Sequence, residues 1–223
     1  MAVSPLRLDH VALWVADRDP IAEFATTRLG MHVIERTDRF TLVGSDARRF
    51  KLTLFAADGP REPGPLRHIG LRVSDLGRAE AALGATTVEV GEGLRIVLVE
   101  AETPVEYDLD HVTLAVPDPE ASASAWCLLG FHPARPRDGT VRVGVAGAYL
   151  ELVEGPTAQS ERPLLNHLAV LVDSAEELRE QAVAAGAEVD DVVDARNTYA
   201  VFVTGPDGVR LEYVEHKPSF SLV

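Results

Sequence analysis

The chain has 223 residues, of which 46% are hydrophobic and 25% are charged, a composition that is typical of folded globular proteins and excludes a disordered chain. Its 35 acidic residues outnumber its 21 basic residues and give a formal net charge of −14, which argues against a nucleic-acid or anionic-membrane partner because phosphate binding needs a basic surface. Cys127 is the only cysteine, residues 1–5 lack a basic region followed by an apolar one, and no apolar run reaches about 18 residues, so we expect a cytoplasmic protein without disulfides, secretory signal or membrane span.

The first hundred residues predict two successive units of the order β-α-β-β-β, the second of them shorter than the first. Alternating apolar residues indicate the strands, while caps and terminal glycines indicate the helices. In the first unit we expect a helix over 21–29 and strands over 8–15, 32–36, 40–44 and 50–56. A Pro/Gly-rich connection at 59–65 leads to the second unit, with a helix over 76–83 and strands over 67–73, 87–90 and 94–99.

The second hundred residues predict the same order twice more. In the third unit we expect a helix over 119–129 and strands over 109–116, 131–134, 140–145 and 148–153. In the fourth we expect a helix over 175–185 and strands over 166–172, 188–193, 198–204 and 209–215. The polar, proline-containing residues 101–104 fall just before the order restarts, so we predict two domains, 1–102 and 103–223.

A repeated phrase supports this duplication. The segment Leu109–Val116 (LDHVTLAV) repeats Leu8–Val15 (LDHVALWV), and His68 and His167 open a second pair of apolar strands at nearly the same spacing. Four strands that begin with histidine therefore indicate four copies of one module, two in each half.

Only the second half adds carboxylates at matching positions. Alternation places Glu151 and Glu212 at equivalent points of their strands, where the first half has Thr53 and Val97. We therefore expect one metal site, confined to the second half and formed by the following side chains: His111, His167 and Glu212, with Glu151 as a fourth ligand or a base.

Two imidazoles and a carboxylate suit a divalent first-row metal, above all Fe(II), with Mn, Ni, Co and Zn as alternatives. Three protein ligands leave about three positions of an octahedral ion for substrate and O₂, whereas a fourth ligand leaves about two. His10 and His68 are interpreted as remnants of the duplication, because threonine and valine face them. Trp14 and Trp126 are expected in the core, and Cys127 as an inert apolar residue.

In its unit order and histidine-initiated strands the chain resembles the vicinal oxygen chelate superfamily, which includes glyoxalase I, bleomycin resistance proteins and type I extradiol dioxygenases. The segment Gly205–Glu212 (GPDGVRLE) is similar to that superfamily's Pro-Asp-Gly turn before a ligand glutamate. The resemblance implies an α+β fold in which four β-α-β-β-β modules pair into two cupped barrels. Two barrels with one metal site imply the dioxygenase ligand set, which maps onto His111, His167 and Glu212.

The resemblance leaves three functions open. The first is extradiol-dioxygenase-like ring cleavage of a small substrate with vicinal oxygens; the second is a glyoxalase- or epimerase-like isomerase or lyase that uses Glu151 and Glu212; the third is non-catalytic, resistance-type binding. Candidate catalytic residues are Glu151, Tyr149 and Tyr199, while Phe202 stands where the dioxygenases usually have a tyrosine. Assembly with further copies of the chain is left open.

Overall fold

The computed structural model describes residues 4–45, 49–136, 139–156 and 160–220. Residues 1–3, on which the expected lack of a secretory signal partly rests, lie outside the described residues. Among the described residues, no helix is long and apolar enough to cross a membrane.

The four predicted units are present, close to their expected boundaries. The first contains β1 (Arg7–Val15), α1 (Asp19–Arg28), β2 (His32–Arg36), β3 (Phe40–Gly44) and β4 (Lys51–Ala56), and the second contains β5 (Leu66–Val73), α2 (Leu76–Leu83), β6 (Thr87–Gly91) and β7 (Leu94–Glu100). The third contains β8 (Asp108–Val116), α3 (Pro119–Leu128), β9 (His132–Pro133), β10 (Val141–Val145) and β11 (Ala148–Glu154). The fourth contains β12 (Leu165–Leu171), α4 (Ala175–Ala184), β13 (Val189–Asp194), β14 (Thr198–Thr204), the short 3₁₀ helix η1 (Pro206–Gly208) and β15 (Arg210–His216).

Local chemistry explains the helix starts and the last turn. Asp75, Asp118 and Ser174 each accept a hydrogen bond from the backbone N–H three residues ahead, which satisfies a donor that the helix itself leaves free. Asp207 adopts φ 55° in η1, so the Pro-Asp-Gly sequence makes a tight turn that returns the chain into β15.

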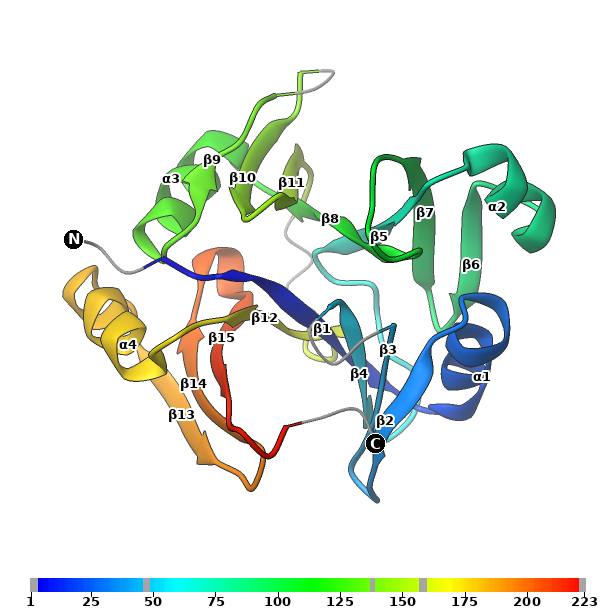
Figure 1. Ribbon diagram of the computed structural model, residues 1–223. Coiled ribbons are helices and arrows are strands. Elements are labelled where there is room, and N and C mark those ends of the chain that lie inside the picture. The colour runs from blue at the N-terminus through cyan, green and yellow to red at the C-terminus, as the bar shows by residue number, and fades with distance from the viewer. Residues whose placement is uncertain (1–3, 46–48, 137–138, 157–159, 221–223) are drawn as a thin grey trace.

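The strands form two cupped sheets, of eight and seven strands, as the α+β fold of paired modules predicts (Figure 1). The eight-stranded sheet has the order β13-β14-β15-β12-β1-β4-β3-β2, and the seven-stranded sheet has the order β6-β7-β5-β8-β11-β10-β9. Within each sheet, two modules join through an antiparallel pair of histidine-bearing strands, β1 with β12 in the eight-stranded sheet and β5 with β8 in the seven-stranded sheet.

The pairing of the modules differs from the expectation that consecutive modules share a barrel. The first module shares a sheet with the fourth, and the second with the third, so each sheet draws strands from both halves. The reason is that all four modules present a similar histidine-bearing edge strand, and the repeat therefore does not determine which edges meet. Figure 1 shows α1 and α2 on one side of the molecule and α3 and α4 on the other. The boundary between residues 102 and 103 stays a prediction.

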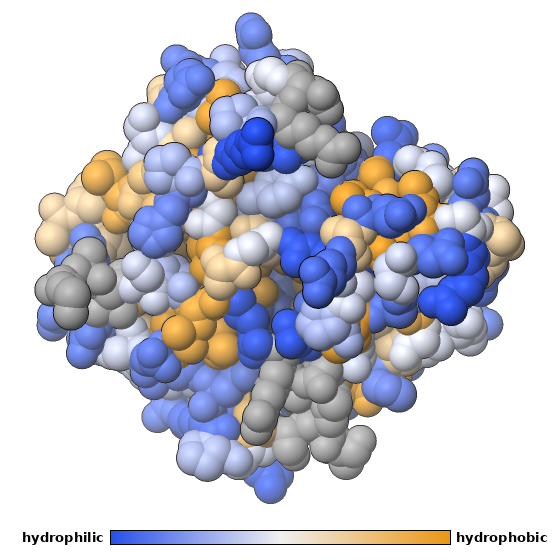
Figure 2. Space-filling model, turned by 45° about the horizontal axis from the view of Figure 1, so that its top comes forward, coloured by the Kyte–Doolittle hydropathy of each residue, from blue (hydrophilic) through white to orange (hydrophobic). Residues whose placement is uncertain are grey.

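The two faces of each strand have different environments. In β1, Val11, Leu13 and Val15 are buried in the main hydrophobic core, while His10 and Trp14 face the inside of the cup. Trp126 is fully buried as expected, but Trp14 is only half-buried. Figure 2 shows that hydrophilic side chains cover much of one outer face, with hydrophobic ones in separate patches between them. Inside the cup, by contrast, polar side chains such as that of His10 stand on strands whose opposite face packs into the hydrophobic core.

Candidate metal centre

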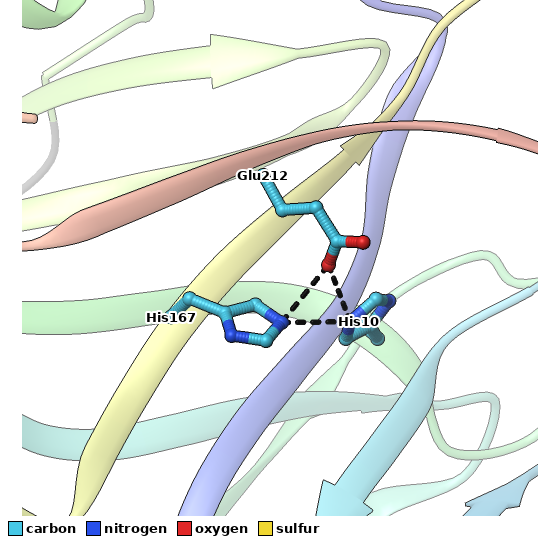
Figure 3. Close-up of side chains that lie close together, drawn as sticks. All are labelled: His10, His167 and Glu212. Atoms are coloured by element: carbon cyan, nitrogen blue, oxygen red, sulfur yellow. Dashed lines mark hydrogen bonds and ion pairs between the residues drawn. The ribbon is translucent and has the colours of Figure 1, made fainter. Parts of the chain in front are cut away.

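Three side chains converge inside the eight-stranded sheet and form what we call the first triad: His10 from β1, His167 from β12 and Glu212 from β15. The Nε2 atoms of the two histidines are 3.1 Å apart, and Glu212 Oε2 lies 3.1 Å from His10 Nε2 and 2.9 Å from His167 Nε2. Figure 3 shows the three side chains pointing toward one another from their separate strands. Their side chains are only 12%, 3% and 8% exposed, so the three donor atoms meet in a nearly dry site.

Neighbouring polar groups fix the orientation of both imidazoles. Asp9 Oδ2 accepts a hydrogen bond from His10 Nδ1 at 3.0 Å, and Asn166 Oδ1 accepts one from His167 Nδ1 at 3.0 Å. Both Nε2 atoms are thereby directed into the triad, as is usual for imidazoles that bind metals. Asp9 is itself held by Lys51, whose Nζ lies 2.8 Å from Asp9 Oδ1 and is equally buried.

The charges of the first triad are strongly coupled. Burial lowers the pKa of His10, but the Glu212 and Asp9 carboxylates raise it by more, to about 9. Burial raises the pKa of Glu212, yet the two histidines lower it to about 2. Burial lowers the pKa of His167. Without a metal, a proton on His10 therefore holds the carboxylate and the imidazoles together, and a divalent cation could replace that proton.

The first triad borders a cavity of about 490 Å³, a size that accommodates small organic molecules. Aromatic rings form much of its wall: Trp14, Phe40, Phe55 and Phe202. The rings of Phe55 and Phe202 lie with their centroids 6.1 and 5.2 Å from that of His167. Polar groups reach the same cavity, among them Thr53, Lys51 and His216.

A second group of the same composition lies in the seven-stranded sheet, and we call it the second triad: His68 from β5, His111 from β8 and Glu151 from β11. The two Nε2 atoms are 3.0 Å apart, and Asp110 Oδ2 accepts a hydrogen bond from His111 Nδ1 at 2.8 Å. Burial and the neighbouring His111 lower the pKa of His68 to about 4. Burial raises the pKa of Glu151, but Arg142 and His111 lower it below its usual value.

The structure does not bring the predicted ligands together in one site. His167 and Glu212 lie in the first triad, whereas His111 and Glu151 lie in the second, so the expectation of one cluster confined to the second half is wrong in its geometry. The cause is the module pairing: β12 lies beside β1, not beside β8. His10 and His68, interpreted as remnants, each complete a triad.

The candidate tyrosines differ in position. Tyr149 stacks on His111, with ring centroids 5.0 Å apart, and therefore belongs to the surroundings of the second triad. Burial, with the nearby Asp110, raises the Tyr149 pKa. Tyr199 packs against the main core, on the face of β14 opposite Ala200 and Phe202, and does not line the cavity at the first triad.

Four residues in and around the first triad were not predicted as site residues: His10, Asp9, Lys51 and His216. The signal for His10 was present, since it is the aligned copy of His111, but using it required the module pairing. His216 ends β15, lines the cavity and places Nε2 3.5 Å from Asp9 Oδ1.

Comparisons with known proteins agree with this architecture. The putative dioxygenase from Bacillus subtilis subsp. subtilis str. 168 has a similar structure, with a TM-score of 0.82 at 18% sequence identity, over 98% of this chain and 88% of that one. Glyoxalase I from Zea mays gives a TM-score of 0.74 at 20% identity, over 94% of this chain and 92% of that one. The cppA protein from Streptococcus pneumoniae TIGR4 gives 0.62 at 14% identity, over 96% and 99% of the two chains. At these identities the likeness shows the fold alone.

A search of curated proteins gives no match in sequence. A profile of the Glyoxalase/Bleomycin resistance protein/Dioxygenase superfamily, however, matches residues 7–97 and 108–213, which is most of the chain. On the repeated modules, the two cupped sheets and this match, the chain belongs to the glyoxalase/bleomycin resistance protein/dioxygenase superfamily.

Proposed function

We propose that this protein is a divalent-metal-dependent enzyme that chelates two adjacent oxygens of a small organic substrate at the first triad. The observation that carries the proposal is the convergence of two imidazole nitrogens and one carboxylate oxygen, 2.9 to 3.1 Å from one another, beside an aromatic-walled cavity. We further propose that the reaction is extradiol-type cleavage of a catecholic ring by O₂. The site is thus the one expected from the sequence in its ligand types, but with His10 in place of His111.

The donor set fits a first-row divalent ion. Two neutral imidazoles and one carboxylate with open positions are the ligands of non-haem Fe(II) oxygenases, and Mn, Co, Ni and Zn accept the same donors. When bound, such an ion supplies a Lewis acid and a template on which two substrate oxygens and O₂ can be held together. His10, His167 and Glu212 would hold it, with Asp9 and Asn166 keeping the imidazoles oriented.

The cavity supports a planar, apolar substrate. Phe55 and Phe202 flank the His167 ring, and Trp14 and Phe40 extend this surface outward from Phe55. Aromatic rings favour offset or edge contacts with another ring, so these walls suit an aromatic diol better than a charged aliphatic substrate.

We assign to His216 the role of the base that removes a proton from the substrate. A catechol loses a proton before its ring is opened, and a base must lie within reach of the bound diol. The imidazole of His216 lines the cavity at the end of β15, beside the buried Asp9 carboxylate. Phe202, at the position where the dioxygenases usually have a tyrosine, has no group that could serve this purpose.

Isomerisation of the glyoxalase or epimerase kind is the second candidate, and one observation disfavours it. That chemistry needs a second carboxylate to move a proton, and Thr53 occupies the fourth equivalent position of the first triad. Glu151, the carboxylate assigned to this step in the sequence analysis, lies in the other sheet.

The test is to load metal-free protein with Fe(II) without oxygen, add a panel of catechols, admit O₂, and follow oxygen consumption and the yellow ring-opened product. We expect turnover with at least one catechol, its loss in His10→Ala, and its retention in the matched variant His111→Ala. Turnover of a 2-oxoaldehyde hemithioadduct or an acyl-CoA epimer with Ni²⁺ or Co²⁺, without any catechol reaction, would replace ring cleavage by isomerisation. Ligand binding that is equally strong after complete chelation would instead indicate a binding protein.

A further inference from the structure

The two triads occupy equivalent positions of the fold but differ in one neighbour. His10 lies opposite Ala169 in the eight-stranded sheet as His68 lies opposite Thr113 in the seven-stranded sheet, so these two histidines correspond, and His167 in the same way corresponds to His111. The carboxylates also correspond, because Glu212 and Glu151 pair with Ala169 and Thr113 on their parallel neighbours. A difference in metal binding must therefore come from the surroundings of the donors.

Both carboxylate oxygens of Glu151 are engaged by side-chain donors. Arg142 donates to Oε1 from Nε at 3.1 Å and again from a second guanidinium nitrogen, and Thr140 donates to the same oxygen at 3.1 Å. Thr113 donates to Oε2 at 3.1 Å. Glu212 differs: the side chains found against its carboxylate among the described residues are the two histidines of its own triad.

The sequence origin of this difference is a single cross-strand position. Arg142 on β10 lies directly opposite Glu151, whereas Phe202 on β14 lies directly opposite Glu212. Each sheet has an arginine over an aromatic ring beside the glutamate, but the two residues have exchanged strands: the position opposite the glutamate holds the arginine in one sheet and the aromatic residue in the other. Arg142 lies over Tyr149 at 4.3 Å, and Arg210 lies over Phe202 at 4.0 Å.

The exchange decides which way each guanidinium points. Arg142 reaches inward to its glutamate. Arg210 stands at the position equivalent to Tyr149, two residues before Glu212, and pairs instead with two exposed carboxylates, Asp190 and Asp191. The first triad is therefore left without a guanidinium against its carboxylate.

The charge balance follows from these contacts. In the second triad Arg142 neutralises Glu151, and Arg72 neutralises Asp110 through a 2.8 Å contact. In the first triad Lys51 neutralises Asp9, but no cation other than the histidines is paired with Glu212 among the described residues. A divalent cation is attracted by an uncompensated carboxylate and repelled by a neighbouring guanidinium, so the two triads are unequal sites.

We propose that Arg142 takes the place of the metal in the second triad, and that His68, His111 and Glu151 form a latent site for a first-row divalent ion that opens when this guanidinium is removed. The intact chain then binds one ion, at the first triad, although it carries two sets of the same ligands. This inference concerns a different cluster from the proposed function, and its test can fail independently of it.

The test counts the ions bound by metal-free protein titrated with Co²⁺, by visible absorption and by elemental analysis after gel filtration. The wild-type chain should bind one ion, and Arg142→Phe, which installs the residue found opposite Glu212, should bind two. Adding His68→Ala to Arg142→Phe should return the count to one, which assigns the new ion to the second triad. Two ions in the wild type, or no gain of an ion in Arg142→Phe relative to the wild type, would overturn the inference.

The reciprocal change is Phe202→Arg, which places a guanidinium opposite Glu212 and should remove the first ion. The control Phe202→Leu should keep it, and circular dichroism with thermal unfolding identifies any variant that has not folded. The double variant Arg142→Phe/Phe202→Arg should bind one ion, now sensitive to His68→Ala rather than to His10→Ala. If the wild type binds no ion while Arg142→Phe binds one, the proposed function fails and the role of Arg142 stands.

Discussion

Metal binding at the first triad should depend steeply on pH, because His10 must lose a proton before its Nε2 can bind an ion. The Glu212 and Asp9 carboxylates raise the pKa of His10 to about 9, so at pH 7 only about one molecule in a hundred has the neutral imidazole. Competition between this proton and the metal ion lowers the apparent metal affinity about 100-fold at pH 7, which corresponds to about 2.7 kcal/mol. We expect the affinity to rise about tenfold between pH 7 and 8 and to level off above about pH 9, with release of close to one proton per ion at pH 7.

The direction of this pH dependence follows from the raised pKa of His10. Because the folded pKa of His10 lies above its ordinary value of 6.5, the proton stabilises the metal-free fold fully below about pH 6.5, and this stabilisation is lost as the pH rises through about 9. Proton release is measured by calorimetric Co²⁺ titration in buffers of different ionisation enthalpy, and affinity by competition with a chelator. Glu151→Gln should leave the profile unchanged. An affinity that is constant from pH 7 to 9 would refute the reasoning.

Two changes should affect stability. Lys51→Met removes the buried ammonium that pairs with Asp9 Oδ1 and should lower the free energy of unfolding by about 3–5 kcal/mol in urea titrations; a loss under about 1 kcal/mol would contradict a buried ion pair. Gly70→Ala would put a Cβ 2.2 Å from a His111 ring atom and should cost about 1–3 kcal/mol, whereas the matched change Gly77→Ala, inside α2, should stabilise by about 0.5–1 kcal/mol. Equal effects of the two glycine variants on the melting temperature would rule out the predicted clash.

Local signals were sufficient to predict the elements of this fold. The alternation in Leu8–Val15 and its repeat at Leu109–Val116 give strands with one apolar face, and the caps at Asp118 and Ser174 fix two helix starts. The turn before Glu212 is set by Pro206 and the residues that follow it. Each of these features depends on residues within one module, so a single sequence is enough to find them.

The partners of each histidine could not be predicted in the same way. His10 and His111 lie in nearly identical sequences. Each of their strands would bury the same apolar face whether it paired with the strand of His68 or with that of His167. The choice depends on how the connections between modules cross the molecule, which involves many weak contacts far apart in sequence. The sequence therefore predicted that histidine and glutamate side chains would cluster, but not that His167 would lie with His10.

The order of synthesis gives the module pairing a further consequence. His10 and His167 are 157 residues apart, so the first triad cannot assemble until the ribosome has released β15, which carries Glu212. His68 and His111 are only 43 residues apart and are available much earlier. Arg142 precedes Glu151 in the chain, so the glutamate of the early triad emerges after its guanidinium. In a growing chain, Glu151 therefore never emerges without the guanidinium that pairs with it.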